Sequence, residues 1–216
     1  MADRALDPGR GTLLLGVTAG AAVGAVLLGE LARVWRRGSA PLPHEAPSLR
    51  LAAEEAVAET AQVARAGYEH GTTRETAMFN LLSSFVGAFM AARGITLLLR
   101  GRRKVGPFRN LRVGRRHIHH FVPGIVIAFV SGVGAILTRD ESLEPKLAIP
   151  FGVGMGLTLD ESALLLELED VYWSREGLLS VQITMAVAAL LAALALGLRF
   201  LRRGELAILP PSVGER

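Results

Sequence analysis

The sequence predicts an all-α protein, a polytopic transmembrane helical bundle of about five spans with one amphipathic extramembrane helix. Of its 216 residues, 50% are hydrophobic and only 20% are charged. The apolar residues are concentrated in runs of about 20, the length that a helix needs to cross roughly 30 Å of hydrocarbon. The charged residues gather between these runs. We therefore expect a multi-pass protein of the cell membrane, surrounded by the lipid bilayer.

Five apolar runs define the expected spans. They are Thr12–Ala32, Thr76–Leu99, Phe121–Thr138, a run that begins near Leu147, and Leu178–Leu198. Between the first two runs, the Ala/Glu-rich stretch Leu49–Ala66 favours a helix but carries too much charge to span, which predicts the extramembrane helix. The expected organisation is a first membrane helix in residues 1–35, a linker with the extramembrane helix in 36–75, a four-span core in 76–200 and a basic tail in 201–216.

Small residues recur at every fourth position in two of the expected spans. They are Gly16, Gly20 and Gly24 in the first span, and Gly124, Ala128 and Gly132 in the third. Residues four apart share one face of a helix, and a face of small residues lets two helices approach closely. These faces predict tight helix packing, including the contacts of a homo-oligomer.

The loop 100–116 carries eight basic residues and no acid. Arginines that flank apolar runs anchor and orient helices, and short basic loops favour the cytoplasmic side. We expect this loop to be cytoplasmic, although Lys and Arg divide almost equally between the two faces of a five-span topology. Little aromatic sequence is interleaved with these arginines, which argues against nucleic-acid binding.

Three of the five histidines stand together just before the third span, as His117, His119 and His120. The chain has no cysteine, so any metal site must use nitrogen and oxygen ligands. Neutral imidazole together with carboxylate suits a divalent transition metal such as Fe, Zn or Mn. The alternative is that these histidines continue the basic loop and contact lipid phosphates.

An acidic segment closes the fourth expected span. Asp160 stands 13 residues after Leu147, a helical rise of about 20 Å, which places Asp160 and Glu161 inside the hydrocarbon. Glu167 would lie near the interface, within about 20° of Asp160 around the helix. Because the third and fourth spans are antiparallel, the acids and the histidines share one membrane face. We therefore interpret Asp160 and Glu161 as candidate catalytic groups, and Glu167 as a candidate metal ligand beside the histidines.

Basic and amide groups are expected on the same face. Arg93 stands towards the C-terminal end of the second span, Arg116 ends the basic loop, and Gln182 and Thr184 open the fifth span. Arg93 and Arg116 are candidates for contacting an anionic lipid head group. The alternative for Arg93 is an ion pair with Asp160 that locks two helices together, because an ionised carboxylate within the bilayer needs a partner or a proton.

Three functions fit this pattern. The first is a metal-dependent lipid-modifying enzyme built on the histidine and carboxylate groups. The second is a carrier or channel for protons or metal ions, in which Asp160 and Glu161 bind the cargo. The third is a structural or assembly membrane protein without catalysis, in which the glycine faces meet partner helices and the buried charges hold the bundle together.

Overall fold

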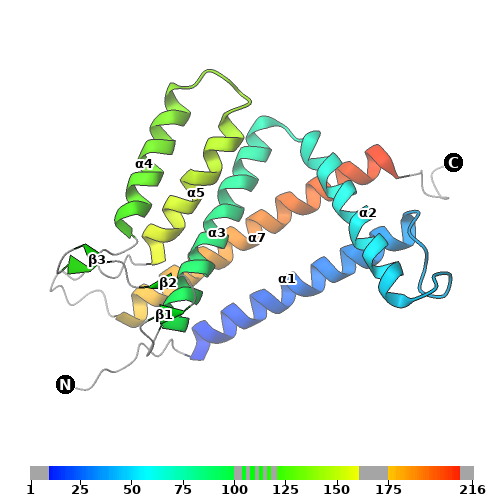
Figure 1. Cartoon of the computed structure of the whole chain (residues 1–216), viewed down its shortest axis with the longest axis horizontal. Coiled ribbons are helices and arrows are strands. Elements are labelled where there is room, and N and C mark those ends of the chain that lie inside the picture. Colours follow the sequence, from blue (N-terminus) through cyan, green and yellow to red (C-terminus); the bar gives the residue numbers. More distant parts are fainter. Residues whose placement is uncertain are drawn as a thin grey trace. The chain divides into compact units, whose positions relative to one another are not determined.

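The computed structural model describes residues 10–99, 121–160 and 175–209, together with four two-residue strands between residues 104 and 117 (Figure 1). Its helices are α1 (Arg10–Arg37), α2 (Leu49–Glu69), α3 (Thr73–Leu99), α4 (Phe121–Leu137), α5 (Glu144–Asp160) and α7 (Arg175–Ile208). The helical class that the sequence predicts is therefore confirmed. Each expected span coincides with a helix, and the Ala/Glu-rich stretch forms α2.

Three of these helices are long and apolar enough to cross a membrane. Their apolar segments are Gly16–Arg37, Thr73–Ile95 and Gln182–Ile208. α4 and α5 have 17 residues each, or about 25 Å of helix, which is shorter than a hydrocarbon core of about 30 Å. The class of membrane protein is thus supported by three helices. The five crossings and the extramembrane position of α2 stay predictions.

Two short β-hairpins occur in the basic loop between α3 and α4. β1 (Lys104–Val105) pairs with β2 (Phe108–Arg109), and β3 (Arg112–Val113) pairs with β4 (Arg116–His117), both antiparallel. The sequence prediction contained no strand in this loop. A glycine follows the first strand of each hairpin in the sequence, and glycine favours tight turns. Strands of this length leave the helical class unchanged.

The chain divides into two compact units. The first unit comprises Met1–Gly16 and Ala77–Ala193, and the second comprises Val17–Thr76 and Leu194–Arg216. The division cuts across α1, α3 and α7, so each of these long helices contributes to both units. The first unit holds α4, α5 and most of α3. The second unit holds α2, most of α1, the first turn of α3 and the C-terminal part of α7.

Glycines bring α5 into backbone contact with two neighbours in the first unit. A Cβ added to Gly154 would lie 2.5 Å from the backbone nitrogen of Ala128 in α4, and one added to Gly156 would lie 2.5 Å from the carbonyl oxygen of Phe85 in α3. Residues two apart point to nearly opposite sides of a helix. α5 is therefore packed between α3 and α4, whose ribbons flank it in Figure 1.

The small residues of α4 pack within the chain. A Cβ on Gly124 would lie 2.9 Å from the carbonyl oxygen of Gly154 and from the hydroxyl of Thr158, and one on Gly132 would lie 3.2 Å from the ring of Phe151. α5 therefore occupies the face of α4 that the sequence singled out for close packing. The homo-oligomer through glycine faces stays a prediction, and the glycines that could form its contacts are those of α1.

In the second unit, α2 packs against α7 and α1. The buried residues of α2 recur at helical spacing and are Ala52, Ala56, Val63 and Gly67. A Cβ on Gly67 would overlap the carbonyl group of Phe200, so the two helix backbones are in contact. Val63 meets Val34 of α1 and Leu201 of α7 in a small hydrophobic core.

Glu59 of α2 binds the Pro-rich linker that precedes this helix. Its carboxylate accepts hydrogen bonds from the backbone N–H groups of Ser39 at 2.7 Å and Ala40 at 3.1 Å, and from the Ser39 hydroxyl at 2.9 Å. Burial raises the pKa of Glu59, but the hydrogen bonds outweigh burial and hold this pKa below its ordinary value. Ser48 caps the start of α2, because its hydroxyl accepts a hydrogen bond from the N–H of Leu51.

Gly154→Ala is expected to lower the free energy of unfolding by about 1–3 kcal/mol, because the new Cβ would overlap the backbone of α4. Gly134→Ala is the matched control in the same hairpin, since its Cβ would lie 3.5 Å from Leu147, an ordinary contact, and alanine favours a helix. Thermal unfolding of the detergent-solubilised chain, followed by circular dichroism, measures both. An unchanged midpoint for Gly154→Ala would contradict the backbone contact between α4 and α5.

Candidate functional site

The polar centre of the first unit is an ion pair between Arg93 of α3 and Asp160, the last residue of α5. Nε of Arg93 lies 2.8 Å from Oδ1 of Asp160. The Asp160 side chain is 3% exposed and the Arg93 side chain is 27% exposed, so the carboxylate is buried while the guanidinium reaches the surface. A buried carboxylate without a partner would be strongly destabilising, and the pairing removes the net charge.

Gln182 of α7 joins this pair. Its Oε1 accepts a hydrogen bond from Nη2 of Arg93 at 2.9 Å, and its Nε2 donates one to the carbonyl oxygen of Leu159 at 2.8 Å. Nη2 of Arg93 also donates to the Asp160 carbonyl oxygen at 3.3 Å. Arg93 and Gln182 thus bond to backbone carbonyls of α5 while they connect three helices. We call Arg93, Asp160 and Gln182 the polar cluster.

An aromatic ring supports Arg93 from its own helix. The central guanidinium carbon lies 5.6 Å from the centroid of the Phe89 ring, within the range of a cation–π contact. Phe89 in turn stacks on Phe85, with centroids 6.5 Å apart. The guanidinium is thus held beside the C-terminal end of α5, where the helix dipole also favours a positive charge.

The polar cluster is suited to joining helices more than to proton transfer. Its carboxylate is buried against a permanent cation, and the side chains of Arg93 and Gln182 are directed at each other and at the end of α5. The sequence predicts that Arg93, Asp160 and Gln182 gather in one half of the bundle, and this convergence is confirmed. Thr184, which was grouped with them, is exposed on α7 and lies outside the hydrogen bonds of the cluster.

Most of the other predicted site residues lie outside the described residues. These are His119, His120, Glu161 and Glu167. The backbone of Arg116 and His117 forms β4, where His117 is opposite Arg112 and Arg116 is opposite Val113. Within the described ranges, no group of three or more His, Asp or Glu residues is placed to hold a metal ion. The metal site and its Fe, Zn or Mn stay predictions.

The polar cluster lies at one end of the α4–α5 hairpin. At this same end the chain enters α4 and leaves α5. Gly124, in the first turn of α4, lies against Thr158 near the end of α5. Gly134 lies against Leu147 at the opposite end of the hairpin. The segments that precede α4 and follow α5 therefore start from neighbouring points.

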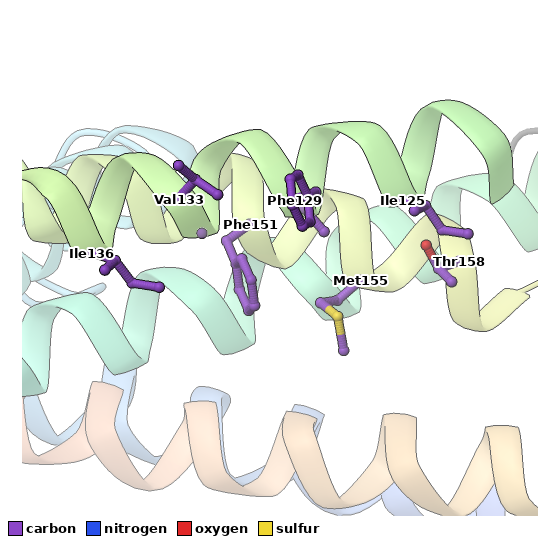
Figure 2. Close-up of a pocket in the computed structure, with 9 residues that line it drawn as sticks. Ile125, Phe129, Val133, Ile136, Phe151, Met155 and Thr158 are labelled. Carbon is purple, nitrogen blue, oxygen red and sulfur yellow. The ribbon is translucent and has the colours of Figure 1, made fainter.

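An apolar groove of about 400 Å³ runs along the same hairpin (Figure 2). The side chains drawn there come from α4 and α5 and include Ile125, Phe129, Val133, Ile136, Phe151, Met155 and Thr158. The Thr158 hydroxyl is already engaged, because it donates to the carbonyl oxygen of Gly154 at 2.8 Å. The groove suits contact with hydrocarbon more than it suits chemistry.

A second buried carboxylate lies in the second unit, and sequence reasoning missed it. The Glu205 side chain of α7 is 3% exposed and accepts hydrogen bonds from Nη1 of Arg33 at 2.7 Å and from Nη1 of Arg37 at 3.2 Å. Arginines near the ends of apolar runs were interpreted only as helix anchors. Two features of the sequence could have indicated this contact. Arg33 and Arg37 are four residues apart and therefore share one face of α1, and Glu205 is an acid in an apolar helix.

Comparisons with protein-family models, with curated proteins and with solved structures find no match to this chain. The fold and the polar cluster define its class, a helical membrane protein with a buried and charge-compensated contact between helices. Its function is therefore argued from its own residues.

Gln182→Leu is expected to lower the free energy of unfolding by about 1–3 kcal/mol, because it removes the hydrogen bonds that Gln182 makes with Arg93 and Leu159. Thr184→Leu, two residues further along the same helix and exposed, is the control and is expected to change stability by less than about 0.5 kcal/mol. Thermal unfolding in detergent compares the two. Equal effects of both substitutions would show that these hydrogen bonds do not stabilise the fold.

Proposed function

We propose that the chain is an integral protein of the cell membrane with a structural or assembly role, in which the polar cluster locks three helices together. The observation that carries this proposal is the pairing of buried Asp160 with Arg93 at 2.8 Å. The pair determines how α3 and α5 meet, and Gln182 adds α7. Polar side chains that bond across helices contribute to holding bundles together in lipid, where the hydrophobic effect between helices is absent.

The setting of Asp160 favours a locking role over catalysis or transport. A catalytic base has to be reached by its substrate, and a cargo site has to be reached by its ion. The Asp160 carboxylate is buried, and its partner Arg93 stays charged at all physiological pH values. The carrier or channel alternative would require Asp160 to release Arg93 during each transport event, which leaves two uncompensated charges.

We infer that α4 and α5 also cross the membrane, which gives five crossings. The turn between them carries Arg139, Asp140 and Glu141, and charges at this tip oppose a hairpin that ends inside the hydrocarbon. A helix a few residues too short for the bilayer is accommodated by local thinning. In this topology the loop 100–116 shares the face of the polar cluster, and its density of basic residues favours the cytoplasmic side.

A charge exchange tests the locking role. Arg93→Asp and Asp160→Arg are each expected to lower the free energy of unfolding by about 3–5 kcal/mol, because each places like charges together in a buried site. The reversed double variant is expected to recover most of this loss. A second double variant, Arg93→Met with Asp160→Leu, removes both charges and covers the case in which the reversed pair does not fit. Thermal unfolding in detergent is the measurement.

The matched control is the exposed ion pair of Arg65 and Glu69 on α2, whose nitrogen and oxygen atoms lie 2.8 Å apart. Exchanging this pair is expected to leave the midpoint of thermal unfolding nearly unchanged at each step, because water screens an exposed ion pair. If neither double variant of the polar cluster is more stable than the single variants, the two charges are not coupled and the locking role is wrong.

A metal-dependent lipid-modifying enzyme is the second candidate, and the geometry of the α4–α5 hairpin favours it. The segments that precede α4 and follow α5 start from neighbouring points, and they carry the ligand candidates His117, His119, His120 and Glu167. These groups would supply nitrogen and oxygen ligands for Fe, Zn or Mn. Glu161 would be the general base, with Asp160 supporting it through Arg93, and Arg116 would contact an anionic head group.

Metal analysis of the purified chain separates the two candidates. The enzyme requires stoichiometric Fe, Zn or Mn that is lost in His119→Ala, whereas the structural role expects no stoichiometric metal. His44→Ala is the control, because His44 is an exposed histidine of the linker. Stoichiometric metal that His119→Ala removes and His44→Ala retains would overturn the structural proposal.

A further inference from the structure

Among the described residues of the second unit, five arginines contact three glutamates. The arginines are Arg33 and Arg37 of α1 with Arg199, Arg202 and Arg203 of α7, and the glutamates are Glu30, Glu75 and Glu205. We call these residues the arginine cluster. Because cations outnumber anions in direct contact, the cluster carries net positive charge.

One half of the arginine cluster is built around Glu30 and Glu205. Arg33 donates from Nε to Glu30 at 2.9 Å and from Nη1 to Glu205 at 2.7 Å, so one guanidinium joins both acids. Arg202 reaches the same two acids, with Nη2 bonded to Glu30 at 2.8 Å and Nη1 lying 3.7 Å from Glu205. This half connects the end of α1 to the end of α7.

The other half of the cluster is built around Glu75 in the first turn of α3. Nη2 of Arg199 lies 2.5 Å from one Glu75 oxygen, and Nη2 of Arg203 donates to the other at 3.1 Å. Arg199 and Arg203 are four residues apart and therefore share a face of α7. The start of α3 is thus tied to the end of α7.

The carboxylates of this cluster are less exposed than Arg199 and Arg202. The side chains of Glu30, Glu75 and Glu205 are 16%, 15% and 3% exposed, whereas those of Arg199 and Arg202 are 63% and 47% exposed. The acids therefore neutralise part of the charge from the inside and leave the outer surface cationic. A ligand that approaches this surface meets guanidinium groups.

Arg199 and Arg202 keep donors for such a ligand. A guanidinium has five N–H donors. Among the described residues, Arg199 contacts a carboxylate through Nη2, and Arg202 donates through Nη2 to Glu30. Each guanidinium has more N–H groups than these contacts use, and the planar fork of arginine binds phosphate oxygens in a bidentate manner.

The arginine cluster lies at the level where the apolar helices end. The apolar segments of α1 and α7 end at Arg37 and Ile208, and that of α3 begins at Thr73. A hydrocarbon core of about 30 Å corresponds to about 20 residues of helix, and the apolar run Leu178–Leu198 ends directly before Arg199. Arg199 and Arg202 are therefore at the depth of lipid head groups.

Apolar side chains continue the same face of α7. Ala195, Arg199, Arg202 and Leu206 follow one another at spacings of four, three and four residues, so they form one stripe. Ala195 and Leu206 are exposed like the two arginines. A free phosphate ion would make no use of these flanking groups, whereas the chains of a lipid would lie against Ala195 with the head group at the arginines.

We propose that Arg199 and Arg202 bind the phosphodiester group of an anionic phospholipid, whose acyl chains lie along the exposed face of α7. This site belongs to the second unit, and it goes beyond the proposed locking role of Arg93 and Asp160 without depending on it. Glu75 and Glu30 orient the two guanidinium groups from behind. The excess of positive charge makes the site selective for an anionic over a zwitterionic head group.

Native mass spectrometry of the detergent-solubilised full chain tests the site. Phosphatidylglycerol is added as the probe, and its apparent Kd is compared with that of phosphatidylcholine. Arg199→Gln with Arg202→Gln is expected to weaken phosphatidylglycerol binding about tenfold. The matched control, Arg50→Gln with Arg65→Gln, removes two exposed arginines of α2 that also pair with glutamates, and is expected to change the Kd by less than about twofold.

Two further variants keep the test decisive if the double substitution disturbs folding. Arg199→Gln alone removes one contact with Glu75 and is expected to weaken binding about threefold or more. Arg199→Lys with Arg202→Lys retains the charge but loses the fork, and is expected to give a Kd between the parent chain and the double Gln variant.

Three results would overturn the proposal. The first is equal affinity for phosphatidylglycerol and phosphatidylcholine. The second is an equal loss of binding in the α2 control, which would mean that any basic surface suffices. The third is displacement of the lipid by inorganic phosphate, which would assign the site to a free anion. Loss of binding in the Arg199 and Arg202 variants alone, without competition by phosphate, is the expected result.

Discussion

Hydrocarbon supplies neither water nor counter-ions, so a charged side chain within a bilayer has to find its compensation inside the protein. Arg93 and Asp160 satisfy this requirement for each other across α3 and α5. The reach of these two side chains restricts which turns of α3 and α5 can lie side by side. Gln182 of α7 extends the same contact, because it bonds both to Arg93 and to the carbonyl oxygen of Leu159.

The ion pair and the glycines of α5 depend on each other. Gly156 brings the backbone of α5 against that of α3, and Gly154 does the same towards α4. Only at such short separations can the Arg93 side chain, anchored on α3 beside Phe89, contact both the carboxylate and the terminal carbonyl of Asp160. Close packing and charge compensation are therefore two aspects of one contact between helices.

The two units compensate charge in different ways. In the first unit one arginine meets one aspartate, and the pair is neutral and largely buried. In the described part of the second unit arginines outnumber glutamates, Glu205 is buried, and Arg199 and Arg202 are exposed. A neutral and buried pair is suited to holding helices together. A cationic surface over buried acids is suited to meeting an anion from outside, which is the physical basis for assigning the two clusters different roles.

Much of the fold and part of the candidate site were accessible from the chain alone. Apolar runs located the helices, because a membrane helix has to bury about 20 residues in hydrocarbon. Because consecutive membrane helices run in opposite directions, the sequence places Arg93, Asp160 and Gln182 in one half of the bundle. The sequence by itself therefore determined which segments are helical and which polar groups share a face.

Only the tertiary structure decided that Asp160 pairs with Arg93, that α5 packs on the face of small residues of α4, and that Glu205 contacts arginines from α1 and α7. Such choices depend on backbone separation and side-chain reach between segments far apart in the chain, which local periodicity does not encode.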